Sequence, residues 1–378
     1  MELPPGWTLG VEEEFHLLDA GTGRLSPSAH LLLESVEPGP VPFWTEPVKS
    51  WVEKEFRVSM VETSTPVCAS LPELREALVA RRSLLVTAAD QLGLLVAASG
   101  TVPDCGASNS AAFPDERFRA ISDEYQHIAA EQTVCACQVQ VGVPDPDQAI
   151  RVINRIRAWL PALLALSASS PYFQHVDTGY ESYRAIEVSR WPTAGQPPVF
   201  ADYAGYRQAV DRLIHSGVIS DYGMVYYDIR PSHRYPTVEI RIADAMPRLD
   251  DVLVLAGLCR ALVVTAIRED EEGVPQLDCP DELLRGALWR AARSGLRDRL
   301  VDVTAGESVP AAELLRRLLA HCQPALAELG DDEAISGGLD ALLRRGTSAQ
   351  RQRRVLSTGE GERAVAADVA LETRAELG

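Results

Sequence analysis

Three consecutive glutamates lie near the amino terminus, within the segment Thr8 to Leu18. The segment combines β-branched, aromatic and aliphatic residues with these acids, which favours a β-strand. On a strand, Glu12 and Glu14 point to one face and Glu13 points to the other. Two carboxylates about 7 Å apart repel each other unless a cation lies between them, and Mg²⁺ prefers oxygen ligands. The segment therefore indicates either a metal and nucleotide site or a solvent-exposed acidic strand edge.

A second pair of charged residues, Glu239 and Arg241, lies in the strand-like segment Thr237 to Ala243. The valine and isoleucines that alternate with them form an apolar face, which leaves both charged side chains on the opposite face. A carboxylate for a metal beside a guanidinium for a phosphate suits phosphoryl transfer. The alternative is a same-face salt bridge worth less than about 1 kcal/mol.

Five stretches of the chain share a pattern with one enzyme family, in the same order. They are GVEEEF at 10–15, ETSTPV at 62–67, SASSPYFQHVDTGYESYRAIEVSRWPTAGQP at 167–197, DIRPSHRYPTVEIRIAD at 228–244, and Gly346-Thr347 with Gln350-Arg351. Together they resemble the type 2 glutamate–cysteine ligase (carboxylate–amine ligase) family over about residues 7 to 370. The resemblance implies a glutamine-synthetase-like fold, in which ATP and metals lie on the concave face of a curved, mainly antiparallel sheet with helices packed outside.

The resemblance also implies the ligands of two or three Mg²⁺ ions. These are the glutamates Glu12, Glu14, Glu55, Glu62 and Glu239. Glu55 and Glu62 are seven residues apart, which places them on opposite faces of a regular strand. A bulge or a break must therefore lie between them, or one of the two is not a ligand.

The chain departs from the family pattern at Gln138 and Gln140, where the family commonly has His-x-His. The alternation of Thr133 to Val143 predicts a strand with both glutamines on one face. A glutamine carbonyl is a neutral, hard ligand for magnesium, but it cannot transfer a proton near pH 7. We expect Gln138 to contact metal and Gln140 to contact ATP. The alternative is a homologue that has lost its activity.

The implied reaction is the ATP-dependent joining of a carboxylic acid and an amine through an acyl phosphate. Arg241 and Arg230 would stabilise the charge of phosphoryl transfer, and Arg241 would also bind ATP. Arg184, Arg190 and the adjacent Tyr183 are candidates to bind the acid substrate, and ordinary surface arginines are the alternative. The family default is glutamate with cysteine, giving γ-glutamylcysteine. The rival readings are another acid and amine, a metal-dependent phosphohydrolase, and a silent nucleotide-binding homologue.

The elements that must position these residues predict an α+β fold in a single domain, 1–378. Residues 7–247 read as strand-rich and 248–372 as helical. The further strands expected are Glu55 to Thr63 and Met224 to Arg230. The helices expected are Ser70 to Ala98, Asp147 to Ala168, Leu249 to Arg268, Asp281 to Arg293, Ala311 to Leu329 and Ala349 to Leu371.

Composition narrows the classes of partner. The chain has 378 residues and a formal net charge of −18, without the basic face of a nucleic-acid-binding protein. Neither a secretory signal nor an apolar run of about 20 residues is visible, so we expect a cytoplasmic protein that does not bind a membrane. Seven scattered cysteines argue against a disulfide framework. We expect small-molecule substrates, and a homodimer is the commonest assembly for such a protein.

Overall fold

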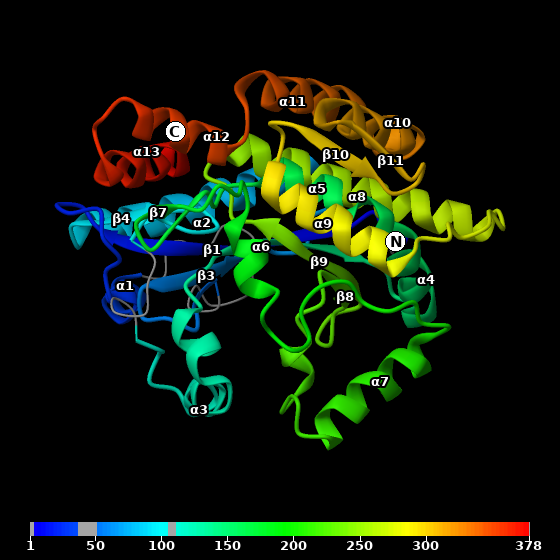
Figure 1. The fold of residues 1–378 in the computed structure, drawn as a ribbon, viewed down its shortest axis with the longest axis horizontal. Helices are drawn as coiled ribbons and strands as arrows, with labels where there is room; N and C mark the ends of the chain where they lie inside the picture. The colour runs from blue at the N-terminus through cyan, green and yellow to red at the C-terminus, as the bar shows by residue number, and fades with distance from the viewer. Residues whose placement is uncertain (1–3, 37–50, 105–110, 378) are drawn as a thin grey trace.

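A seven-stranded sheet forms the centre of the computed structural model, which describes residues 4–36, 51–104 and 111–377 (Figure 1). Its strand order is β2 (Val52–Lys54), β3 (Met60–Ser64), β1 (Leu9–Asp19), β5 (Ala136–Gly142), β9 (Thr237–Asp244) and β8 (Ile229–Pro231), with β4 (Leu94–Ala97) pairing with the far end of β1. Neighbouring strands of this sheet are antiparallel. The predicted α+β fold with a mainly antiparallel sheet is therefore confirmed.

Helices cover one face of the sheet, the upper face in Figure 1. They are α2 (Leu71–Gln91), α4 (Pro146–Ile156), α5 (Leu160–Ser167), α8 (Leu249–Glu271) and α9 (Asp281–Ser294), with α10 (Ala311–Leu329), α11 (Asp332–Arg345), α12 (Ser348–Ser357) and α13 (Glu362–Arg374) on the outside. The largest core cluster lies between these layers and contains Val11, Val139 and Ile240. Burial of these apolar side chains holds the sheet against its helices.

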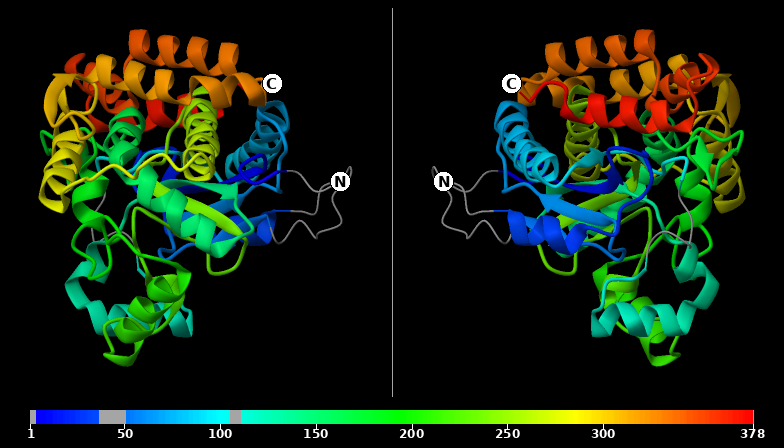
Figure 2. Two further views of the ribbon diagram at one scale, coloured as in Figure 1. Left: turned by 90° about the vertical axis from the view of Figure 1, so that its right-hand side faces the viewer. Right: turned by 90° about the vertical axis from the view of Figure 1, so that its left-hand side faces the viewer.

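The opposite face of the sheet has a different cover. There α3 (Glu116–Glu131) and α7 (Tyr203–His215) lie below the sheet, as Figures 1 and 2 both show. A separate cluster that includes Phe56, Ile121, Trp191 and Tyr206 packs these helices together. The shorter elements are α1 (Ala29–Ser35), α6 (Tyr183–Val188), the hairpin β6 (Tyr172–Phe173) with β7 (Val176–Asp177), and two 3-10 turns, Arg157–Trp159 and Tyr222–Met224. The cleft described below lies on this side.

The amino-terminal half corrects two predicted elements. The helix expected to reach Ala98 ends at Gln91, and β4 follows it after a turn at Gly93, whose φ is +68°. A continuous apolar run conceals this change, because a buried helix and a buried strand look alike over a few residues. Of the strand predicted from Glu55 to Thr63, only the part from Met60 onward is a strand. β2 ends just before the segment, at Lys54, and β3 begins at Met60. The break that the two glutamates required is therefore present.

The carboxyl-terminal half was predicted to be helical throughout, but it also contains two strands. It contains the hairpin of β10 (Arg299–Asp302) and β11 (Glu307–Pro310). The single helix expected from Ala349 to Leu371 is divided into α12 and α13, with Gly359 and Gly361 at positive φ between them. The helix expected from Asp147 to Ala168 is interrupted by the first 3-10 turn, and α3, α7 and α11 were not predicted.

Among the described residues, Cys68, Cys137, Cys259, Cys279 and Cys322 are free thiols, and Cys105 lies outside them. In the same part of the chain, none of the helices combines the length and apolar character needed to cross a bilayer.

Candidate active site

The glutamates of β1 alternate between two environments. Glu13 is 1% exposed and faces the helices, where its carboxylate pairs with Arg82 at 2.6 Å. Glu12 and Glu14 face the other side and remain partly open. The alternation of the strand therefore separates a structural carboxylate from two that face a cavity, as the sequence predicted.

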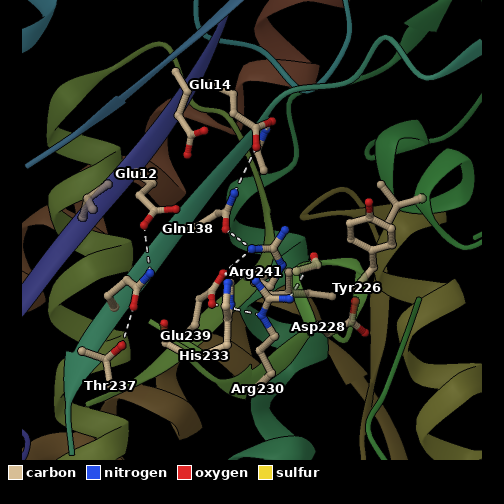
Figure 3. Close-up of a pocket in the computed structure, with 18 of the residues that line it drawn as sticks. Glu12, Glu14, Gln138, Tyr226, Asp228, Arg230, His233, Thr237, Glu239 and Arg241 are labelled. Atoms are coloured by element: carbon tan, nitrogen blue, oxygen red, sulfur yellow. Dashed lines mark hydrogen bonds and ion pairs between the residues drawn. The ribbon is translucent and has the colours of Figure 1, made fainter. Parts of the chain in front are cut away.

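Strand register brings the other predicted residues beside this pair. Glu14 is opposite Glu62 on β3, Glu12 is opposite Gln138 on β5, and Gln140 is opposite Glu239 on β9. Directly opposed residues point to the same face of a sheet, so these side chains share one wall. The wall belongs to a cleft of about 2020 Å³, shown in close-up in Figure 3. Its lining includes Glu12, Glu14, Glu55, Glu62, Gln138, Gln140, Arg184, Arg230, Glu239 and Arg241.

Glu239 lies between two arginines. Arg230 reaches it across the strand pair with two hydrogen bonds, Nε to Oε2 at 3.0 Å and Nη2 to Oε1 at 3.1 Å. Arg241 also bonds to its Oε1. Burial opposes ionisation of Glu239, but the charges of Arg241 and Arg230 overcome it and lower its pKa to about 2. This group stays ionised, and the cluster carries a net positive charge that suits a phosphate.

The two glutamines connect the acidic and basic parts of the wall. Gln138 Nε2 donates to Glu14 Oε1 at 3.0 Å, and its carbonyl accepts from Arg241. Gln140 Nε2 donates to Glu12 Oε1 at 2.9 Å, and its carbonyl accepts from Thr237. Figure 3 shows this chain of dashed contacts from Glu14 to the arginines. Each glutamine thus orients one glutamate by donating a hydrogen bond from its amide N–H₂ while its carbonyl accepts another.

The acidic end of the wall is crowded with carboxylates. Burial and the charges of its neighbours raise the pKa of Glu62 well above its ordinary value, and Glu62 donates a hydrogen bond to Glu12. Burial, then the charge of Glu14, raises the pKa of Glu55 to about 7. Burial also raises the pKa of Glu12 and Glu14. These groups repel one another, and a cation relieves that repulsion.

The donor set suits Mg²⁺ shared with a phosphate. Within residues 4–36, 51–104 and 111–377, no group of three or more His, Cys, Asp or Glu side chains is close enough to hold an ion alone. Mg²⁺ commonly uses one or two carboxylates together with water and substrate phosphates. Paired carboxylates such as Glu12 with Glu62, on the same cleft wall as Arg230 and Arg241, match that pattern rather than a closed protein cage.

The three predicted substrate-binding residues occupy different places. Arg184 lines the cleft, and its guanidinium donates to the carbonyls of Ile242 and Arg241 at 3.2 Å each. Arg190 and Tyr183 are not among the described residues that line the cleft. The geometry therefore gives a place in the cavity only to Arg184.

Arg190 and Tyr183 have protein partners that account for their positions. Arg190 pairs with Glu131 at 2.6 Å and with Glu187. The ring of Tyr183 packs against Phe173, with the two centroids 5.2 Å apart. A role for these two residues in binding the acid stays a prediction that the cleft geometry does not support.

One acidic residue of the cleft was not predicted as a site residue. Asp228 lines the cavity at the edge strand, next to Tyr226 in Figure 3. Burial raises its pKa to about 7, although Arg184 and Arg241 act against this rise. A signal was available: Asp228 opens the motif at 228–244 and lies two residues before Arg230 in the predicted strand Met224 to Arg230, so strand alternation gives both side chains one face.

Solved structures share this fold at low sequence identity. Glutamate–cysteine ligase from Francisella tularensis, solved in complex with AMP, aligns with a TM-score of 0.70 and 12% identity, over 98% of this chain and 90% of that one. The bifunctional glutathione synthetase from Pasteurella multocida aligns with a TM-score of 0.72 and 14% identity, over 98% of this chain and 52% of that one. The chain therefore shares its fold with these two enzymes.

Sequence comparisons narrow the class to a family. The profile of glutamate–cysteine ligase family 2 matches residues 8–367. A protein from Salinispora tropica with the provisional name glutamate–cysteine ligase 2 is 41% identical over 97% of this chain and 95% of its own length. A Frankia alni protein, provisionally glutamate–cysteine ligase 2-3, is 45% identical over 92% of this chain, which spans only 39% of that relative. The chain belongs to glutamate–cysteine ligase family 2.

Proposed function

We propose that this protein is a magnesium-dependent ligase that uses ATP to join a carboxylic acid to an amine. The observation that carries the proposal is the composition of one cleft wall. One end of this wall holds several carboxylates that lack a basic ion-pair partner among the described residues, and the other end holds the Arg230–Glu239–Arg241 cluster. Family membership and the fold shared with a ligase crystallised with AMP support it. By family default we propose glutamate and cysteine as the first pair, with γ-glutamylcysteine as product.

The residues of the cleft divide the work of phosphoryl transfer. Glu12, Glu14 and Glu62 would hold Mg²⁺, which would neutralise the charge of the nucleotide phosphates. Arg241, held in place by Glu239 and Gln138, points a guanidinium at the charge that develops on the transferred phosphoryl group. Arg230 fixes Glu239 from the other side and adds positive charge. The acid becomes an acyl phosphate, which an amine then attacks.

The test is an ADP-formation assay with ATP, Mg²⁺ and a panel of acids and amines that begins with glutamate and cysteine. We expect ADP to form only when one acid and one amine are both present, and we expect one ADP for each amide formed. Phosphate release without an amine would favour the phosphohydrolase instead. ATP binding without ADP formation across the panel would overturn the proposal in favour of a silent homologue.

A further inference from the structure

Asp228 has a defined position beside the phosphate-binding cluster. In the β8–β9 pair, Arg230 is opposite Glu239 and Ile229 is opposite Ile240, and Arg241 N–H donates to the Asp228 carbonyl at 2.8 Å. Asp228 is therefore the next partner in the register, opposite Arg241. Opposed side chains share a face, so its carboxylate lies on the cleft wall next to the Arg241 guanidinium (Figure 3).

The backbone around Asp228 is held on both sides. Its N–H donates to the carbonyl of Gly195 at 2.8 Å, and its carbonyl accepts from Arg241. Gly195 belongs to the motif at 167–197, and both it and the adjacent Gln196 line the cleft. The backbone of Asp228 is thus fixed by two separate segments, which limits where its side chain can lie before a ligand arrives.

The side-chain contacts of Asp228 leave unused acceptors. Gln196 Nε2 donates to Asp228 Oδ2 at a long 3.4 Å, and Gln196 Oε1 is buried without a hydrogen-bond partner among the described residues. Because the amide N–H₂ faces the carboxylate, the opposite amide orientation would place two acceptors together and is disfavoured. The pair therefore offers a carboxylate and an amide oxygen to a group that has several N–H donors.

We propose that Asp228 and Gln196 bind the ammonium group of the amine substrate, and that the Asp228 carboxylate takes its proton. This inference rests on the proposed function. An ammonium has three donors and no lone pair, so it must lose a proton before it can attack. The neutral amine then forms the C–N bond at the acyl carbon, and the C–O bond to phosphate breaks with its electron pair. The second proton leaves the new amide nitrogen to the released phosphate or to water.

The charge pattern separates this end of the cleft from the acid-activating end. Asp228 faces Arg184 and Arg241, whose charges favour its ionised form, while burial raises its pKa to about 7. A group that titrates near neutrality suits proton transfer at physiological pH. Arg241 therefore lies between the carboxylates predicted to share Mg²⁺ and the carboxylate proposed to receive the amine.

The experiment compares two nucleophiles in the Asp228→Asn variant, with glutamate, ATP and Mg²⁺. Cysteine enters as an ammonium, whereas hydroxylamine is uncharged at neutral pH and traps the acyl phosphate as a hydroxamate. We expect kcat for amide formation with cysteine to fall by about 100-fold or more, with hydroxamate formation within about threefold of wild type. Retained hydroxamate formation also shows that the variant is folded and binds ATP.

Two further variants sharpen the comparison. Gln196→Ala should raise KM for cysteine by about tenfold with a smaller change in kcat, because it removes a neutral acceptor. Asp221→Asn is the matched control, since Asp221 borders the same cleft but pairs with Arg117 at 3.2 Å, and its rates should equal those of wild type.

Each failure has a different meaning. Wild-type amide formation in Asp228→Asn, or an equal loss with both nucleophiles, overturns the role of Asp228. A wild-type protein that forms no hydroxamate with any acid of the panel refutes the proposed function, and this inference with it.

Discussion

At the residue scale, one end of the cleft wall consists of carboxylates that have no basic ion-pair partner among the described residues. Glu12 accepts a hydrogen bond from Gln140 and shares a proton with Glu62, and burial raises its pKa. Such a group costs free energy in the metal-free fold, because neighbouring carboxylates repel each other. The bound cation proposed above would account for its presence, which stability alone does not.

Replacing Glu12 by glutamine should abolish catalysis while the fold persists. The side chain keeps its shape but loses the charge that would attract Mg²⁺, and removal of such a transition-state contact costs about 100-fold or more in kcat. The measurement is ADP formation, with the thermal unfolding midpoint as a check on folding. Glu124→Gln, on the exposed surface of α3, is the control and should match wild type. Wild-type turnover in Glu12→Gln would remove this residue from the site.

The acidic cluster also predicts how stability depends on pH when metal is absent. The pKa of Glu55 is about 7 in the folded protein, against an ordinary 4.5. The folded state therefore binds more protons than the unfolded state between these values, so the free energy of unfolding falls as pH rises from about 4.5 to about 7. Urea unfolding in EDTA at pH 5 to 8 should show this fall.

Glu55→Gln removes the titrating group and should flatten the pH profile without abolishing it, because Glu12, Glu14 and Glu62 also have raised pKa values. Above pH 7 the variant should be more stable than wild-type protein in EDTA. Glu124→Gln should keep the wild-type slope. An identical slope in Glu55→Gln would show that Glu55 is not held in this buried, like-charged environment.

At the element scale, β1 shows how much the sequence predicts. Its alternation correctly placed Glu12 and Glu14 on one face, because strand periodicity needs only the residues themselves. The partner of Glu13 was not predictable, since Arg82 comes from α2, 69 residues away. Asp228 was missed although the predicted strand Met224 to Arg230 places it on the face of Arg230; its position opposite Arg241 follows only from the register of β8 with β9, which depends on tertiary pairing.

Neighbouring glutamates of β1 should respond differently to substitution. Glu13→Ala leaves the fully buried Arg82 without its carboxylate, and breaking a buried pair costs about 3–5 kcal/mol of unfolding free energy. Glu12→Ala, on the cleft face, should cost less than about 1 kcal/mol or stabilise the metal-free protein, because it relieves repulsion. Chemical denaturation of both variants measures the contrast. Equal losses in the two would contradict the assignment of faces.

At the scale of the whole molecule, the sheet separates two tasks. Helices lie above one face of the sheet, and α3 and α7 lie below the other (Figures 1 and 2). The upper face is apolar and buried, and the lower face lines the cleft. The general fold could be predicted from the order of five motifs. Several elements could not be predicted, because their apolar patterns are brief or their burial is decided by distant partners. These are the short strand β4, the hairpin of β10 and β11, and the helices α3 and α7.

The central claim is that carboxylates from separate strands and the Arg230–Glu239–Arg241 cluster bind one metal–nucleotide complex. The most direct test is a crystal structure with Mn²⁺ and a non-hydrolysable ATP analogue, in which anomalous scattering locates the metal. We predict Mn²⁺ between the terminal phosphates and at least two of Glu12, Glu14 and Glu62, with Arg241 on the γ-phosphate. Nucleotide bound elsewhere, or metal without any of these three glutamates as a ligand, would contradict the account.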